Sequence, residues 1–388
     1  MMQRSRVILH VQDGDFRFAS RVLKQARSAL RSGFASRVEL LGLFDDDLPV
    51  VDETEDGLRI HRTVHAPTGR RKGWVPALWR LWRRWMRFYR AGKSLPCDLV
   101  HCHSVGALVP SVLLGRYHSV PVVYDAHELE SQAGQPRAAS LLALIIESVL
   151  IRRVDVVVCV SDAIADWYAR RFSIVRPMVV RNVPDIRSQV DLVGPHPLRA
   201  RCGLGAEDLV FLYQGALSPG RRVEQLLRVF AKAAADRHVV FMGYGVLQPE
   251  IEEAARRHRN IHFVSAVPPE QVLAHTKDAN VGICGGENIC LSYFVSLPNK
   301  LFEYLHAGLP LLVPQWPEMS RIVDSYGCGW TIGEADDEWL EAIVGLTRDS
   351  IATAAMGARR AAAQFSWEAE AQVLEQGYLR ALGRAGGQ

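Results

Sequence analysis

Short apolar runs alternate with amphipathic stretches of helical length along most of this chain. In the first half, runs rich in Val, Ile and Leu predict strands at 6–11, 37–43, 99–101, 120–124, 156–160 and 178–181. Apolar residues at helical spacing predict helices at 17–31, 75–90, 141–151 and 161–171. Because strands and helices that alternate in this way form parallel βαβ units, we predict one doubly wound sheet.

The same alternation restarts after 186–205, a weakly periodic stretch with several Pro and Gly residues that we interpret as a linker. Beyond it we predict strands at 209–214, 239–242, 261–264, 281–284 and 309–313, with helices at 223–235, 249–257, 269–276 and 298–306. The predicted fold class is therefore α/β, with two Rossmann-like doubly wound parallel-sheet domains at 1–185 and 206–365. Ligands of such sheets bind at the carboxyl ends of the strands, so we expect the two domains to face a central cleft.

Composition excludes several classes of protein. The 388 residues are 48% hydrophobic and 23% charged, which rules out disorder, collagen-like repeats and coiled coil. Seven Cys form no C-x-x-C pair, as in a reduced cytosolic protein. The longest apolar stretch, 141–151, is well short of the roughly 20 residues that span a bilayer. We expect a cytoplasmic protein without a membrane span or a signal peptide.

Charge is distributed unevenly. The chain carries a formal net charge of +4, yet 57–97 contains eleven Lys or Arg and no acid, so the rest sums to −7. A local asymmetry of this size indicates a surface that meets a charged partner.

The centre of this basic stretch predicts a helix at 75–90. Four of the nine Trp lie between Trp74 and Trp85, interleaved with Arg. A helix that lies among anionic headgroups needs this combination of residues. Ordinary packing of the Trp face on the sheet and binding of nucleic acid are the alternatives; we favour peripheral contact with the inner face of a membrane and expect no nucleic acid. The candidate membrane-contact residues are Trp79, Arg80, Trp82, Arg83, Arg84, Trp85 and Arg87.

The segment 296–310, SLPNKLFEYLHAGLP, is the most informative for chemistry. Pro298 suits the first position of a helix, where the amides of Asn299 and Lys300 are free to bind an anion. Glu303 lies one and a half turns further on, where its carboxylate can accept hydrogen bonds from sugar hydroxyls. This arrangement fits a nucleotide diphosphate, although a well-capped core helix with Glu303 in solvent is the alternative.

A second candidate site is GALSPGRRV, 215–223. A strand ends at Gly215, and the loop after it delivers Arg221 and Arg222 to a helix start. Cations there oppose the helix dipole, so a bound anion explains their position better than local stability does. A solvated pair of surface Arg is the alternative.

Five phrases spread over the chain resemble the large family 4 of retaining glycosyltransferases. They are VVYDAHELE (122–130), VCVSDAIADWY (158–168), RNVPD (181–185), YQGALSPGRRVEQLL (213–227) and the SLPNKLFEYLHAGLP segment. The resemblance implies a GT-B fold, a nucleotide-diphosphate sugar as donor, and no metal or other cofactor. It also implies that the segment 366–388 is a helix that crosses back to the first domain.

The resemblance implies roles for single residues. Glu303 is expected to bind the nucleotide ribose, and the amides of Asn299 and Lys300 the donor phosphate. Arg221 is expected to neutralise the departing diphosphate, and His127 to face the donor sugar. A lone His is otherwise more often structural. Gly14 matches a place where the backbone approaches donor and acceptor.

This chain also departs from the family pattern. The usual Glu-x7-Glu signature has its first Glu where this chain has Val295, so we expect the donor sugar to be recognised differently. Glu287 and Asn288, in the loop after the strand 281–284, are the candidate substitutes, unless they are merely loop residues in water. Arg222 stands where a Gly is common.

His101 and His103 point to one face of a predicted strand and suggest a metal site. No third ligand has suitable spacing, however, so we expect two structural histidines and no metal.

Together these observations predict a glycosyltransferase that moves a sugar from a nucleotide-diphosphate sugar, with retention, to a glycan or lipid-linked acceptor in cell-surface polysaccharide or glycoconjugate biosynthesis. A sugar-nucleotide epimerase of the same fold, or a catalytically weak membrane-associated scaffold, is the alternative.

Overall fold

The computed structural model describes residues 6–17, 19–44, 47–65, 74–188 and 197–385. The chain divides into two compact units. Unit 1 comprises Met1–Arg181 and Glu370–Gln388, and unit 2 comprises Asn182–Ala369. Three cations of the basic stretch, Arg70, Arg71 and Lys72, and the part 189–196 of the predicted linker lie outside the described residues.

Unit 1 is built on an eight-stranded sheet in the order β3-β4-β2-β1-β5-β6-β7-β8. Its strands are β1 Val7–Gln12, β2 Arg37–Phe44, β3 Val51–Glu53, β4 Leu58–His65, β5 Leu99–His103, β6 Val122–Ala126, β7 Val156–Cys159 and β8 Met178–Val179. All neighbouring pairs are parallel except β3 with β4. The chain order reverses between β1 and β5, and the carboxyl ends of these two strands therefore mark the ligand edge of the sheet.

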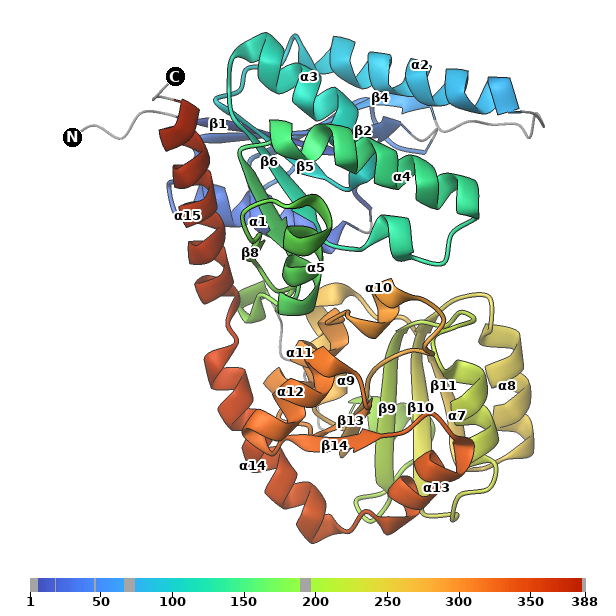
Figure 1. The fold of residues 1–388 in the computed structure, drawn as a ribbon. Coiled ribbons are helices and arrows are strands. Elements are labelled where there is room, and N and C mark those ends of the chain that lie inside the picture. The colour runs from blue at the N-terminus through green and yellow to red at the C-terminus, as the bar shows by residue number, and fades with distance from the viewer. Residues whose placement is uncertain (1–5, 18, 45–46, 66–73, 189–196, 386–388) are drawn as a thin grey trace. The chain divides into compact units, whose positions relative to one another are not determined.

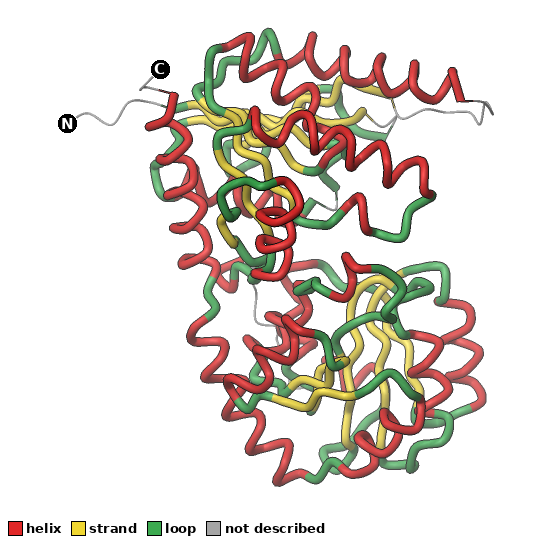
Figure 2. The backbone as a smooth tube through the Cα atoms, in the orientation of Figure 1, coloured by secondary structure: helices red, strands yellow, loops and turns green. Residues whose placement is uncertain are grey.

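Helices enclose this sheet on both faces, as the tube view shows (Figure 2). They are α1 Ser20–Arg31, α2 Trp74–Gly92, α3 Leu108–His118, α4 Arg137–Leu150, α5 Asp162–Phe172 and α15 Trp367–Ala385. Helices α2, α3 and α4 pack side by side in one row (Figure 1). Because both faces are covered, the central strands are buried along almost their whole length, and their Val, Ile and Leu residues made them visible in the sequence.

Unit 2 carries a six-stranded parallel sheet in the order β11-β10-β9-β12-β13-β14. The strands are β9 Leu209–Ala216, β10 Arg237–Tyr244, β11 Ile261–Ser265, β12 Val281–Ile283, β13 Leu311–Pro314 and β14 Gly329–Ile332. The helices are α6 Pro197–Cys202, α7 Val223–Phe230, α8 Gln248–Arg257, α9 Val272–Thr276, α10 Leu291–Phe294, α11 Asn299–His306, α12 Pro317–Tyr326, α13 Asp336–Gly345 and α14 Arg348–Gln364. Here the order reverses between β9 and β12.

The core of unit 2 lies on both faces of this sheet. Along β9, Val210 and Leu212 belong to one apolar cluster, whereas Phe211 and Tyr213 belong to the other. The alternation follows from the two-residue period of a strand. The central strand therefore holds both layers of helices together and fixes where its carboxyl end lies.

The predicted fold class, two parallel-sheet α/β domains, is confirmed. Each predicted strand has a counterpart, while β3, β4, β14 and several helices were not predicted. The stretch interpreted as a linker contains α6, whose Leu198 is fully buried in unit 2 and whose Arg199 donates a hydrogen bond to the Asp278 carbonyl at 2.8 Å.

Candidate active site

The residues predicted to bind a nucleotide diphosphate gather at the carboxyl ends of β9 and β12. Gly215, near the end of β9, has a φ of +111°. A Cβ on the neighbouring Gly243 of β10 would lie only 1.9 Å from the Gly215 carbonyl oxygen. The absence of side chains here lets the strand ends approach each other and leaves the edge open to a ligand.

Helix α11 begins at Asn299, directly after Pro298, whose ψ of 148° is extended. The Lys300 ammonium group lies 3.7 Å from the centroid of the Tyr213 ring. No described residue forms an ion pair with Lys300. The sequence predicted only its amide as a ligand, whereas the structure also brings its charged side chain to the end of β9, near Gly215.

A short chain of hydrogen bonds fixes the position of the Glu303 carboxylate. The Gln214 amide group donates to the Glu303 carboxylate, and the Gln214 amide oxygen accepts a hydrogen bond from the Thr276 hydroxyl at 2.8 Å. Gln214 and Thr276 are both almost fully buried. The sequence analysis missed them; the signal was a Gln at the end of an otherwise apolar strand.

An apolar pocket borders Glu303. Its lining comes entirely from unit 2, namely Pro184, Ile186, Pro269, Val272 and Leu273 besides Glu303 itself. These apolar side chains offer a surface against which a flat group could lie beside the carboxylate.

Arg221 and Arg222 have different environments although they are adjacent. The Arg221 guanidinium lies 4.6 Å from the centroid of the Tyr293 ring, and among the described residues it has no acidic partner. The charges of Lys300 and Arg221 both act on Cys284, the buried thiol after β12 whose pKa burial raises to about 12. Two cations that have no acidic partner in the described part of the chain therefore converge on one strand edge.

Arg222 instead serves the fold of unit 2. Its side chain is 1% exposed, and its guanidinium donates to the Gly286 carbonyl at 2.9 and 2.6 Å and to Glu334 at 2.6 Å. Its φ of +67° lies in the left-handed region that favours glycine, which explains physically why a Gly suits this position. The structure assigns the predicted ligand Arg222 to protein contacts.

The loop after β12 carries the two candidates for sugar recognition. The Glu287 amide donates to the Gly220 carbonyl at 3.0 Å, so this loop is tied to the loop that delivers Arg221. Asn288 is exposed, and Val295 is buried just after α10. Glu287 and Asn288 thus lie beside the strand edge, whereas Val295 belongs to the interior.

In unit 1 the predicted residues lie at the ends of β1 and β6. The Gly14 carbonyl accepts a hydrogen bond from the Leu43 amide at 2.8 Å. Half-buried His127 has a buried Nδ1 without a hydrogen-bond partner among the described residues. Beside them, Asp13 forms an ion pair with Arg84 at 2.9 Å, and burial raises the pKa of Glu130 to about 7. The sequence analysis missed both acids.

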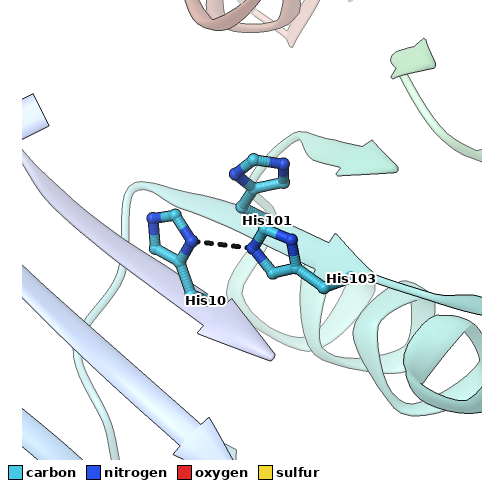
Figure 3. Close-up of side chains that lie close together, drawn as sticks. All are labelled: His10, His101 and His103. Atoms are coloured by element: carbon cyan, nitrogen blue, oxygen red, sulfur yellow. Dashed lines mark hydrogen bonds between the residues drawn. The ribbon is translucent and has the colours of Figure 1, made fainter. Parts of the chain in front are cut away.

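A buried polar cluster lies between β1, β5 and β6 of unit 1. His10, His101 and His103 are all 0% exposed, and burial lowers the pKa of His103 to about 3. Figure 3 shows their three rings gathered together, with a hydrogen bond of 2.9 Å between His10 Nδ1 and His103 Nε2. His10 was not predicted, because nothing in the sequence pairs it with residues more than ninety positions away.

Asp125 anchors this cluster to α1. Its carboxylate accepts two hydrogen bonds of 2.8 Å from Arg21 and one of 2.9 Å from Gln25. Burial would raise the pKa of Asp125, but Arg21 and His103 outweigh it and hold this pKa well below its usual range.

Helix α2 exposes part of the predicted membrane face. Trp79 and Trp82 are 55% and 52% exposed, and Arg83 lies over the Trp79 ring. Arg80 and Arg87 are exposed as well. Arg84 and Trp85 face the protein instead: Arg84 pairs with Asp13, and Trp85 donates to the Gly106 carbonyl at 2.9 Å. No helix among the described residues is long and apolar enough to cross a membrane.

Comparison with known proteins links both halves to one class of enzyme. Residues 20–186 match the family model described as Glycosyltransferase Family 4, and residues 208–349 match the model described as Glycosyl transferases group 1. No curated protein matches the sequence.

Solved structures resemble the chain over almost its whole length. A sucrose-phosphate synthase from Thermosynechococcus elongatus is 16% identical, with a TM-score of 0.74 and coverage of 98% of this chain and 100% of that one. The Anabaena protein Alr3699/HepE in complex with UDP and glucose is 16% identical, with a TM-score of 0.71 and coverage of 96% and 98%. The lipopolysaccharide outer core galactosyltransferase WaaB is 15% identical, with a TM-score of 0.66 and coverage of 96% and 99%. At these identities the likeness establishes the fold.

Proposed function

The chain is a glycosyltransferase of the GT-B fold, and from that premise we propose that it transfers a sugar from a nucleotide-diphosphate sugar to a glycan or lipid-linked acceptor. We further propose that the transfer retains the anomeric configuration and serves cell-surface polysaccharide or glycoconjugate biosynthesis. The proposal is carried by two cations, Arg221 and Lys300, which have no acidic partner among the residues that the structure describes and lie beside the fixed carboxylate of Glu303. A solved structure of HepE with UDP-glucose supports a donor of this class.

The donor binds along the strand edge of unit 2 in a fixed order. The base enters the apolar pocket beside Glu303, and the Glu303 carboxylate accepts hydrogen bonds from the ribose hydroxyls. The diphosphate meets the Lys300 side chain, the first amides of α11 and Arg221, because cations and helix N-termini favour anions. The Glu303 carboxylate repels phosphate, so the ribose rather than the diphosphate lies beside it.

Catalysis follows from the same charges. When the bond between sugar and diphosphate breaks, negative charge develops on the leaving phosphate, and Arg221, Lys300 and the helix amides stabilise it. The acceptor hydroxyl oxygen bonds to the anomeric carbon as the bond to the diphosphate breaks, and the leaving phosphate takes the hydroxyl proton. This step requires no metal. Glu287 and Asn288 contact the donor sugar. The roles of His127 and Gly14, which the resemblance implies, stay predictions.

A panel of nucleotides tests the donor site directly. We expect UDP, GDP or ADP, or one of their sugars, to raise the melting temperature of the full chain. Glu303→Ala should lower kcat/KM for the donor roughly 10- to 100-fold, the cost of losing charge-assisted hydrogen bonds. Glu341→Ala, which removes an exposed carboxylate of unit 2, is the matched control. Turnover of Glu303→Ala equal to that of the control would contradict the proposal.

Product analysis separates transfer from epimerisation. A transferase consumes the donor faster when acceptor is added, whereas an epimerase releases an altered free sugar without any acceptor. A scaffold would bind nucleotide and leave the donor intact.

We also propose that α2 holds the enzyme on an anionic membrane from the cytoplasmic side, as a peripheral protein. Exposed Trp79 and Trp82 can insert among headgroups, and Arg80, Arg83 and Arg87 supply the positive charge. Each basic residue near such a surface contributes about 1 kcal/mol. The enzyme would then meet a lipid-linked acceptor at the membrane that holds it.

Vesicle flotation tests this contact. Changing Arg80, Arg83 and Arg87 to Glu should weaken binding to phosphatidylserine-containing vesicles by at least ~100-fold. The control is the same reversal at Arg256, Arg257 and Arg259, exposed in unit 2. Equal binding by both variants would reject the membrane contact and leave the donor proposal untouched.

A further inference from the structure

The buried histidines of unit 1 share one face of two adjacent strands. In the parallel register, His10 of β1 is the partner of His101 of β5, and His103 follows His101 by two residues. Because side chains alternate along a strand, His101 and His103 point to the same side, and His10 points there from the next strand. An H-x-H pair with a third His on the neighbouring strand can direct three imidazoles toward one point.

The distances between the rings suit a shared ligand. One ring nitrogen from each histidine can be chosen so that all three lie within 4.8 Å of one another. The ring centroids are 4.8 Å apart for His10 and His101, 5.1 Å for His10 and His103, and 4.2 Å for His101 and His103. Zinc bonds to imidazole are about 2.0–2.1 Å long, so small side-chain rotations suffice to bring the nitrogens to one ion.

A second shell of partners is already present. His103 Nδ1 lies 3.5 Å from the Asp125 carboxylate, and His101 Nδ1 is 2.8 Å from the Tyr378 hydroxyl on α15. Histidines that bind metals usually direct their other ring nitrogen to a carboxylate or another polar group, which fixes the tautomer. Here the Tyr378 hydroxyl holds Nδ1 of His101 and leaves its Nε2 for ligation, while the Asp125 carboxylate lies near Nδ1 of His103 without a hydrogen bond to it.

The cluster is also incompletely satisfied by the protein. His10 Nε2, His101 Nε2 and His103 Nδ1 are buried and have no hydrogen-bond partner among the described residues. Buried polar atoms are rarely left unpaired, because each costs free energy of desolvation. Three neutral imidazoles in one buried cluster, each with one unpaired nitrogen, match the donor set of a zinc site.

We propose that His10, His101 and His103 bind one divalent transition-metal ion of the zinc class inside unit 1. The ion replaces the hydrogen bond between His10 and His103 and links β1 to β5. Through His101 and Tyr378 it also links this sheet to α15. This site is separate from the donor site of unit 2, and the transfer step does not depend on it.

Metal content of the full chain tests the proposal. After removal of adventitious metal with a chelator, incubation with ZnCl2 and gel filtration, we expect about one zinc per chain by elemental analysis. Cobalt in place of zinc should give the strong visible bands of a tetrahedral site. Saturating zinc should raise the melting temperature by roughly 5 °C.

Two kinds of variant assign the site. Tyr378→Phe keeps the packing of α15 but removes the second-shell hydroxyl, and should weaken zinc binding roughly 10- to 100-fold. His10→Gln should abolish the stoichiometric zinc and the cobalt bands. The matched control is His238→Gln with His262→Gln, another hydrogen-bonded His pair, in unit 2, which should retain both.

Wild-type protein alone can overturn the proposal, whatever the stability of the variants. Less than ~0.1 zinc per chain, or cobalt spectra that match hexahydrated cobalt, rejects the site. Loss of zinc in the His238/His262 variant with full retention in His10→Gln also rejects it. Both results leave the proposed transferase activity unaffected.

Discussion

The two units have similar architectures, and Arg21 of unit 1 has the opposite role to Arg221 and Lys300 of unit 2. In unit 1, the Arg21 guanidinium is buried against the Asp125 carboxylate, which neutralises its charge inside the fold. In unit 2, Arg221 and Lys300 lie on aromatic rings at the strand edge, without acidic partners among the described residues. A cation beside a carboxylate stabilises the protein, whereas a cation kept away from carboxylates remains available to an anionic ligand.

Removing Arg21 is the strongest test of this contrast. Arg21→Ala leaves the Asp125 carboxylate buried without its main partner and should lower the free energy of unfolding by about 3–5 kcal/mol. Urea unfolding followed by circular dichroism measures this loss. Arg17→Ala, which removes an exposed ion pair with Asp15, should cost less than about 1 kcal/mol. Equal losses of unfolding free energy in the two variants would contradict a structural role of Arg21.

Removing Arg221 should reduce activity and leave stability almost unchanged, which is the opposite of what we expect for Arg21. Arg221→Ala is expected to lower kcat roughly 100- to 1000-fold, because the departing phosphate loses its stabilising charge. Its unfolding free energy should stay within about 1 kcal/mol of wild type. Arg228→Ala, which removes an exposed ion pair with Asp336, serves as the control for both measurements. Strong destabilisation with normal kcat would place Arg221 with the structural residues.

The next residue along the chain sharpens the comparison. Arg222→Ala frees the Gly286 carbonyl and Glu334 from their donor, and should cost about 2–3 kcal/mol of stability. Arg222→Gly should cost less than Arg222→Ala, because glycine relieves the left-handed backbone. Thermal unfolding in the presence and absence of nucleotide measures both. The reverse order of the two variants would show that backbone strain is unimportant here.

The smallest expected effect concerns pH. Burial raises the pKa of Glu130 from its usual 4.5 to about 7, so the folded state holds a proton that the unfolded state releases between these values. The contribution of Glu130 to stability should therefore fall by about 1–3 kcal/mol as pH rises from 4.5 to 7, whereas buried histidines such as His103, whose pKa burial lowers, contribute in the opposite direction. Glu130→Gln should gain stability relative to wild type as pH rises through this range, and Glu128→Gln, on an exposed neighbour, should not. A difference in unfolding free energy between wild type and Glu130→Gln that does not change with pH would contradict the raised pKa of Glu130.

The strands could be predicted because of how the sheets are packed. Strands such as β1 and β9 are buried on both faces, so their sequences are continuous apolar runs. The edge strand β3 is exposed and reads as Val, Asp, Glu, which has no such signature. Helix α6 was taken for a linker because it is short and follows a Pro- and Gly-containing stretch.

The positions of candidate site residues could be predicted where these residues sit in one contiguous segment. Arg221 and Glu303 belong to local patterns just before a helix and within a helix, and their roles as ligands stay predictions. The sequence could not distinguish Arg221 from Arg222, since their difference depends on Gly286 and Glu334, far along the chain. His10 was missed for a similar reason, because only the register of β1 against β5 brings it to His101.

The C-terminal helix α15 has a consequence for how the chain is made. Tyr378 and Ala381 are fully buried in unit 1, although all of unit 2 is translated before them. At about 5–20 residues per second, a ribosome needs roughly 10–40 s to pass from residue 182 to residue 388. During that time unit 1 lacks its last helix and cannot complete its fold. Unit 2, whose residues are contiguous in the sequence, can finish folding first.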